Sequence, residues 1–240
     1  MSGRDRETLA ARHGAVLTHI AEACARVGRD PSSVTLVAIS KTVPAADLVA
    51  AVDAGLERLG ENRVQEGVAK APFVPGASWE LVGPLQSNKA RRALETFARI
   101  QSVDSLELAG RLDRIAADLA RPGRFPILLQ VNVDDDAAKA GFDPLELERS
   151  LPAILGLPML RVEGLMTIGR FVTDPEDARP TFRSLRSLAE RLREAHPALG
   201  PELSMGMSND YAVAVEEGAT IVRVGRALFG ERGSAPEPRC

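Results

Sequence analysis

One repeated unit dominates the sequence: a short apolar run, a polar turn and a longer amphipathic stretch. Because parallel neighbouring strands need a crossover between them, this alternation predicts a parallel sheet. Eight such units favour closure of the sheet. We therefore expect an α/β fold, a single (β/α)8 TIM-type barrel. The predicted strands cover residues 34–39, 58–60, 79–82, 100–103, 127–133, 160–166, 202–205 and 221–224.

An additional helix is expected before the first strand. Residues 4–27 carry apolar side chains at three- and four-residue spacing among charged ones, which is typical of an amphipathic helix. Prolines at 44, 84, 144 and 175 stand near the expected starts of later helices, where a missing N–H costs nothing. We expect one domain over residues 1-230 and a flexible C-terminal tail over residues 231-240.

A doubly wound open sheet is the competing architecture, and it would carry a glycine-rich turn after its first strand. Here the first strand instead ends in Ser40-Lys41-Thr42. The barrel makes a sharper positional prediction. Functional residues should follow the carboxyl ends of the strands, with a phosphate site in the loops after strands seven and eight.

Composition narrows the possible partners. The chain has 30 Lys and Arg against 33 Asp and Glu, a net charge of -3, so neither nucleic acid nor anionic lipid is an expected partner. The two cysteines give no disulfide framework, and the charged N-terminal stretch does not resemble a signal peptide. Since no apolar run approaches the ~20 residues of a membrane helix, we expect a soluble cytoplasmic protein.

No metal site is expected. Asp134-Asp135-Asp136 has no histidine or spaced carboxylate beside it, so we interpret it as a solvated turn. The histidines at 13, 19 and 196 lie on predicted helices away from the strand ends, which makes them poor candidates for acid–base roles.

Lys41 comes directly after the first predicted strand. In a barrel its ammonium would project into the mouth, where partial desolvation favours the neutral amine that attacks an aldehyde. The alternative is an ordinary lysine at the beginning of a loop. Asn62, after the second strand, either contacts a ligand or caps the next helix.

The seventh and eighth units end in small and hydroxyl residues. Residues 203–210 read LSMGMSND, and a helix is expected from about Asn209, so backbone N–H groups and the helix dipole could bind an anion. In the eighth unit, Gly225 allows close backbone approach and Arg223 can point inward. Two converging loops of this kind indicate a phosphate site, with plain turn chemistry as the alternative.

Together these segments resemble the YggS/PROSC family of pyridoxal phosphate homeostasis proteins, which share the barrel of the alanine racemase N-terminal domain. The resemblance runs from the N-terminal helix to Gly230. The matching strings are LVAISKTVP, GENRVQE, LVGPLQSNK, LLQVNV with KAGF, VEGLMTIG, LSMGMSND and IVRVGRALFG.

The resemblance implies pyridoxal 5′-phosphate (PLP) as the cofactor, held as a Schiff base on Lys41. Arg223 would face the pyridine nitrogen, while Asn62 and Met166 would line the ring. The phosphate would be held by Ser204 and Ser208 and by the backbone of Gly206, Met207 and Gly225. The chain departs from the family pattern at Glu80, where histidine is common, and at Arg63, where tyrosine is common. We expect both departures to affect only the rim.

A non-catalytic PLP carrier is the function we expect. An arginine against the pyridine nitrogen keeps the ring a poor electron sink. Racemases of the related fold add a tyrosine base from a separate domain, whereas the only tyrosine here, Tyr211, is expected to be a packing residue. The carrier hypothesis includes transient contact with PLP-dependent apoenzymes and a monomeric state. The alternatives are a slow amino-acid racemase and a barrel that binds another phosphorylated metabolite without PLP.

Overall fold

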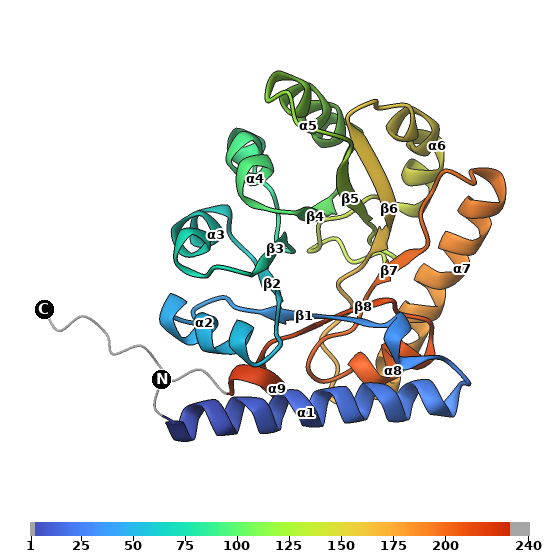
Figure 1. Cartoon of the computed structure of the whole chain (residues 1–240). Helices are drawn as coiled ribbons and strands as arrows, with labels where there is room; N and C mark the ends of the chain where they lie inside the picture. Colours follow the sequence, from blue (N-terminus) through green and yellow to red (C-terminus); the bar gives the residue numbers. More distant parts are fainter. Residues whose placement is uncertain (1–2, 231–240) are drawn as a thin grey trace, which may run out of the picture.

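The chain closes into a parallel barrel, as predicted. The computed structural model describes residues 3–230, with side chains from Arg6 onward. Within this range the strands follow one another in chain order, and β1 pairs with β8 to complete the barrel (Figure 1). The strands are β1 Thr35–Ile39, β2 Arg58–Glu61, β3 Ser78–Leu81, β4 Arg99–Val103, β5 Phe125–Gln130, β6 Leu160–Met166, β7 Glu202–Ser204 and β8 Ile221–Val224.

Helices surround the strands, and the expected extra helix, α1 Gly3–Arg26, precedes β1 (Figure 1). The predicted tail over residues 231-240 lies outside the described residues. The other helices are α2 Ala45–Asp53, α3 Val64–Lys70, α4 Ala90–Thr96, α5 Leu106–Asp118, α6 Pro144–Leu155, α7 Arg179–Ala195, α8 Tyr211–Glu216 and α9 Arg226–Phe229. Short 3-10 helices lie at η1 Pro31–Ser33, η2 Ala71–Phe73, η3 Ser87–Lys89 and η4 Pro175–Ala178.

Side chains from the strands and the inner helix faces form the core. Phe97, Phe125, Phe142 and Phe182 are among its largest fully buried members, and Trp79 is also buried there. Local capping fixes several helix starts: the Ser105 side chain accepts from Leu108 N at α5, and Asp143 caps α6 ahead of Pro144. Burial of the apolar side chains and capping by Ser105 and Asp143 therefore explain where these helices pack and where they begin.

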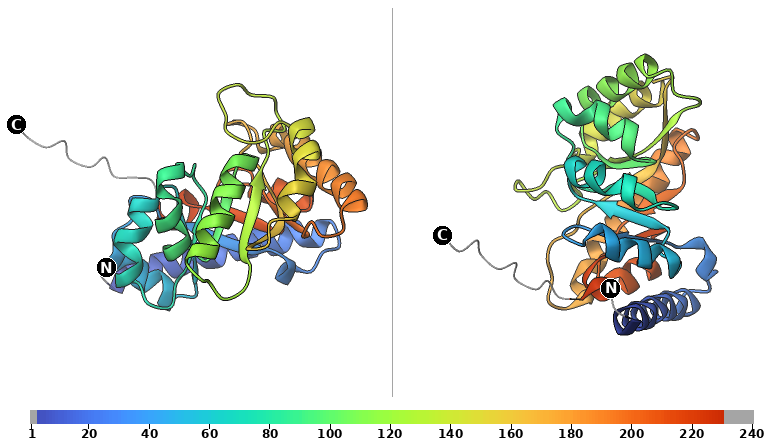
Figure 2. Two further views of the ribbon diagram at one scale, coloured as in Figure 1. Left: turned by 90° about the horizontal axis from the view of Figure 1, so that it is seen from above. Right: turned by 60° about the vertical axis from the view of Figure 1, so that its left-hand side comes forward.

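The fifth strand is shorter than predicted. It ends at Gln130 rather than at residue 133, because the chain turns there: the Asn132 side chain donates to Asp136 O at 2.9 Å and accepts from Asp136 N at 3.2 Å. The connection from β5 to α6 then projects from the barrel (Figure 2). Pro84 also departs from expectation, since it follows β3 three residues before η3 rather than starting a helix.

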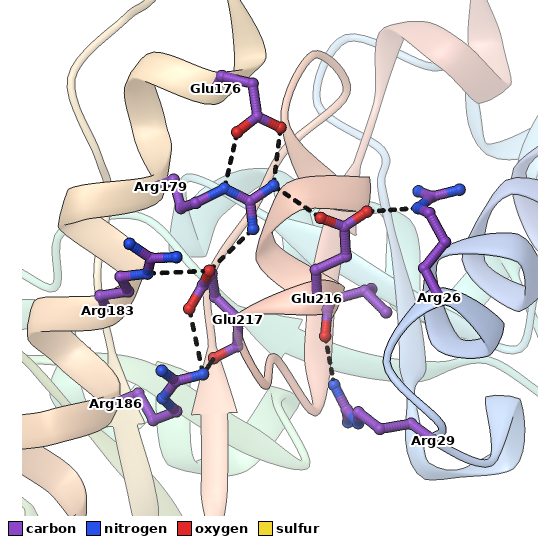
Figure 3. A network of polar contacts seen from close by, with 9 residues as sticks. Arg26, Arg29, Glu176, Arg179, Arg183, Arg186, Glu216 and Glu217 are labelled. Atoms are coloured by element: carbon purple, nitrogen blue, oxygen red, sulfur yellow. Dashed lines mark hydrogen bonds and ion pairs between the residues drawn. The ribbon is translucent and has the colours of Figure 1, made fainter.

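The helix α1 packs along α8 and α9 on the outside of the barrel (Figure 1). An ionic network ties the end of α8 to α1 and α7 (Figure 3). Glu217, directly after α8, accepts from three arginines of α7, with Arg179 closest at 2.8 Å. Glu216 pairs with Arg26 of α1 at 2.6 Å and with Arg179 at 2.7 Å. The carboxyl end of α8 is thereby anchored to both neighbouring helices.

Candidate functional site

A cavity of about 1410 Å³ opens at the carboxyl ends of the strands. This is the end of the barrel at which functional residues were predicted. Residues that follow β1, β2, β3, β6, β7 and β8 line it, and α1 and α9 close one side. Among the described lining residues, Lys41 is the only lysine. The lining includes Ile39, Lys41, Asn62, Gly83, Ile168, Met207, Ser208, Asp210, Arg223, Gly225 and Arg226.

Lys41 sits in a constrained turn between β1 and α2. The next residue, Thr42, has a φ of 66°, a left-handed conformation that a β-branched residue adopts only when its surroundings impose it. Its hydroxyl donates to Lys41 O at 2.5 Å, and its backbone N donates to Glu66 at 3.3 Å. The backbone that carries Lys41 is therefore fixed from the side of α3.

A buried clamp holds the residue before Lys41. The Ser40 hydroxyl donates to Glu61 Oε1 at 2.8 Å, and Lys70 Nζ donates to the same oxygen at 2.7 Å and to Ser40 O at 2.9 Å. Burial raises the pKa of Glu61, and the hydrogen bonds from Lys70 and Ser40 oppose that rise. Both flanks of Lys41 are thus tied to the β2–α3 segment.

The loops after β7 and β8 meet, as predicted. Ser208 Oγ accepts from Gly225 N at 3.1 Å and from Ala227 N at 3.5 Å, while Arg226 donates to Asn209 Oδ1 at 2.9 Å. The helix α8 begins at Tyr211, two residues later than expected, because Asn209 and Asp210 belong to a turn closed by the Asp210 N–H···O=C Met207 bond of 3.1 Å. Two backbone turns therefore converge beside the cavity.

Arg223 supplies a fixed guanidinium on the cavity wall. Its side chain is buried, and it donates to Ser204 Oγ at 2.6 Å and to Thr167 O at 2.7 Å. Burial lowers the pKa of Arg223 to about 10, and the nearby charge of Asp210 opposes the shift. The group remains cationic at neutral pH.

The structure brings most of the predicted site residues to one cavity. Lys41, Asn62, Met207, Ser208, Arg223 and Gly225 all line it. Asn62 does not cap the following helix, whose N-cap is Arg63 without a side-chain hydrogen bond. Among the described residues, three others from the predicted set are absent from the lining: Met166, Ser204 and Gly206.

These three residues lie behind the cavity wall. Met166 is fully buried in a cluster that packs beneath Ile39 and Ile168, both of which line the cavity. Ser204 Oγ accepts from Arg223 and donates to Gln101 Oε1 at 2.6 Å. Gly206 has a φ of +90°, and its carbonyl accepts from Arg223 N at 3.0 Å. All three support residues that face the cavity.

Other predictions have mixed outcomes. Glu80, expected at the rim, is buried inside the barrel, whereas Arg63 is exposed. Tyr211 is a buried packing residue, as expected, and its hydroxyl bonds to His19 Nδ1 at 3.0 Å.

The described residues contain no group of three or more potential metal ligands. Within the same range, no helix combines the length and hydropathy needed to cross a membrane.

Two residues of the cavity wall escaped the sequence analysis. Asp210 is 4% exposed, and its carboxylate accepts from Met207 N at 2.6 Å. Gly83 packs so closely on Asn62 that a Cβ atom there would lie 2.2 Å from Asn62 O. The acid before a short helix and the glycine after the third strand were the available signals.

Asp210 gives a pH-dependent prediction. Burial raises its pKa, so from about pH 3.9 upward the unfolded chain loses the proton first, and stability falls as the pH rises through the folded-state pKa. Asp210→Asn retains an acceptor for Met207 N and removes this loss. We expect the variant to gain stability relative to wild type as the pH rises above about 4, measured by urea unfolding. Asp53→Asn, at an exposed position on α2, is the matched control; equal pH profiles for all three proteins would contradict the prediction.

Comparison with known proteins agrees with this geometry. A family model described as the alanine racemase N-terminal domain matches residues 14–233. The alanine racemase of Clostridium difficile 630 is 15% identical, with a TM-score of 0.69 over 91% of this chain and 56% of that one, which shows the fold alone. Fold and cavity thus define a barrel of the alanine racemase N-terminal domain class.

Closer relatives specify the family. The pyridoxal phosphate homeostasis protein of Aquifex aeolicus is 40% identical over 90% of this chain and 95% of its own length, and that of Escherichia coli K12 is 39% identical over 89% and 92%. The structure of PipY from Synechococcus elongatus, solved with PLP bound, is 44% identical, with a TM-score of 0.78 over 88% of this chain and 100% of PipY. This chain belongs to the pyridoxal phosphate homeostasis protein family.

Proposed function

We propose that this protein binds PLP as a Schiff base on Lys41 and carries or buffers it for intracellular cofactor homeostasis. The observation that carries the proposal is the shared cavity: one lysine, one fixed guanidinium and two converging backbone turns face the same space. The lysine can react with an aldehyde, the guanidinium can donate to a pyridine nitrogen, and the backbone turns can bind a phosphate.

The residues of the cavity fit this cofactor chemically. The Lys41 amine condenses with the aldehyde and releases water, and hydrolysis of the Schiff base reverses the step. The turns at Met207–Ser208 and Gly225 bind the phosphate through backbone N–H groups and the Ser208 hydroxyl. Arg223 donates to the ring nitrogen, and Asn62 contacts the ring. Met166, Ser204 and Gly206 support these groups from behind.

The relatives support the same assignment. Their names describe homeostasis of pyridoxal phosphate, and PipY was solved with PLP bound. Neither name describes an enzyme activity. We therefore extend PLP binding, and with it the carrier role, to this chain.

A carrier role also follows from the chemistry of the wall. When bound, PLP can act as an electron sink, but a donor such as Arg223 against the ring nitrogen keeps that nitrogen unprotonated and weakens the sink. Tyr211 does not act as a second base, since its hydroxyl bonds to His19 on α1 and it lies outside the described cavity lining. Carbanion chemistry at a bound amino acid is thereby restrained.

The carrier proposal includes a location, an oligomeric state and a class of partner. We place the protein in the cytoplasm as a monomer that contacts PLP-dependent apoenzymes transiently. Sedimentation at several protein concentrations tests the monomeric state, and transfer of PLP to a purified apoenzyme tests the contact.

Lys41→Ala is expected to abolish the covalent complex. PLP-loaded wild-type protein should show a Schiff-base absorbance band, and borohydride reduction followed by peptide mass spectrometry should place the cofactor on Lys41. Lys89→Ala is the matched control, because Lys89 lies in η3 outside the described cavity lining; its band should persist. An unmodified Lys41 peptide from saturated wild type would refute the assignment.

The same preparation separates the carrier from a slow racemase. Solvent deuterium should enter the α-carbon of added amino acids far below the roughly 1–1,000 turnovers per second typical of enzymes. Incorporation within that range would favour the racemase.

A further inference from the structure

A chain of hydrogen bonds runs from Arg223 through the barrel interior. Arg223 donates to Ser204 Oγ at 2.6 Å, Ser204 donates to Gln101 Oε1 at 2.6 Å, and Gln101 Nε2 donates to Glu80 Oε2 at 2.6 Å. The four residues come from β8, β7, β4 and β3. Each is at most 4% exposed. The wall of the cavity is thus connected to a carboxylate on the far side of the barrel.

The two ends of this chain fix its direction. A guanidinium only donates and an ionised carboxylate only accepts. Arg223 therefore makes the Ser204 oxygen an acceptor, which sends the single Ser204 proton to Gln101. At the other end, Glu80 makes Gln101 present its amide nitrogen, and its oxygen is left facing Ser204. Both ends impose the same orientation of the Gln101 amide, so the chain has one arrangement.

Two arginines lie beside the Glu80 carboxylate. Arg58 Nη1 lies 3.3 Å from Glu80 Oε1, and Arg99 Nη1 lies 3.6 Å from Glu80 Oε2. Glu80 itself is 1% exposed, so its hydrogen bond to Gln101 and its attraction to the mostly buried Arg99 act with little screening, whereas Arg58 is 46% exposed. The carboxylate end of the chain is therefore as firmly defined as the guanidinium end.

We propose that Glu80 is a positioning residue for Arg223: it imposes the direction of the Glu80–Gln101–Ser204–Arg223 chain and so fixes the guanidinium on the cavity wall. The effect on Arg223 is independent of any ligand. Its consequence for cofactor binding rests on the proposed function, in which Arg223 meets the pyridine nitrogen.

Glu80→Gln is the informative substitution because it keeps the shape and removes the constraint. A glutamine at position 80 can either accept from Gln101 or donate to it. The Gln101 amide then has a second arrangement, with its nitrogen toward Ser204, and the Ser204 oxygen is shared between two donors. Arg223 should consequently sample two environments in the variant and one in wild type.

Nitrogen-resolved NMR of the arginine side chains in PLP-free protein tests this directly. Wild type should give one set of Arg223 Nη–H signals, assigned by their loss in Arg223→Lys. Glu80→Gln should double or broaden them, and Gln101→Met, which removes the middle link and leaves all charges in place, should also perturb them. Unchanged Arg223 signals in both variants would overturn the proposal.

Glu163→Gln is the matched control. Glu163 pairs with Arg99 at 2.7 Å and with Arg161 at 2.6 Å, so this variant removes a carboxylate from the same arginine cluster without touching the chain. It should leave the Arg223 signals unchanged. Equal perturbation by Glu163→Gln and Glu80→Gln would assign the effect to the charge of the cluster and overturn a specific role for Glu80.

The loaded protein supplies the second measurement. PLP should bind Glu80→Gln about two- to tenfold more weakly than wild type, the range of one typical net hydrogen bond, and the pH titration of its Schiff-base band should shift. Glu163→Gln should bind like wild type. If wild type forms no adduct on Lys41, the proposed function fails, while the PLP-free NMR measurement still decides the role of Glu80.

Discussion

Arg223→Met is expected to lower the free energy of unfolding by about 1–3 kcal/mol for each buried acceptor that loses its donor. The substitution leaves Thr167 O without its donor and removes the donor to Ser204 Oγ, both in the barrel interior. It also removes the nearby cation that favours ionised Asp210. Urea unfolding at neutral pH measures the loss, and PLP titration of the folded variant should show much weaker binding.

Arg226→Met is the matched control for that prediction. Arg226 also lines the cavity, but it is exposed, and its side chain donates to Asn209 Oδ1 at the surface. Its loss should change stability by about 1 kcal/mol or less, as exposed polar contacts do. A loss from Arg223→Met as small as the one expected for Arg226→Met would mean that the barrel interior does not depend on the Arg223 hydrogen bonds.

The fold could be predicted because its signal is local. Each strand is a short apolar run, and the apolar residues of α7 at 182, 185, 188, 189 and 192 recur at helical spacing and are buried as that spacing requires. The loops at the carboxyl ends follow from the barrel rule. Lys41, Ser208, Arg223 and Gly225 could therefore be assigned to one end of the barrel from their order along the chain.

The depth of each inward side chain could not be predicted. Ser204 and Ser208 are four residues apart, yet one lies in the barrel interior and the other in the wall of the cavity. The nearest partners of Glu80 are Gln101 on β4 and Arg58 on β2. How far along the barrel axis each of these strands is shifted relative to β3 depends on the stagger of the closed barrel. Stagger is a property of all the strands together, so no local pattern reports it.

The clamp on Lys41 was missed for a similar reason. Lys70 and Ser40 are 30 residues apart, and their contact depends on how α3 packs on β2 and β3. In the sequence, Lys70 is an ordinary charged residue near a helix end. Only packing turns it into a donor to the backbone next to Lys41.

Gly206→Ala should be the most damaging small substitution at the phosphate turns. Gly206 has a φ of +90°, which strains any residue with a Cβ, and the added atom would lie 2.5 Å from Ala214 Cβ and 3.0 Å from Tyr211 Cα. Strain of about 1–3 kcal/mol and overpacking of about 1–3 kcal/mol both act against the variant. We expect a total loss of about 2–6 kcal/mol in urea unfolding.

The same overlap should weaken cofactor binding, because relief requires α8 to move away from β7. That shift would displace Met207 and Ser208 from Gly225, with which Ser208 shares a 3.1 Å hydrogen bond. Gly110→Ala is the matched control: Gly110 lies in α5 with no atom within 4 Å of an added Cβ, so alanine should stabilise the helix by about 0.5–1 kcal/mol. A Gly206→Ala protein that unfolds and binds PLP like wild type would show that this turn tolerates a Cβ and does not set the geometry of the phosphate site.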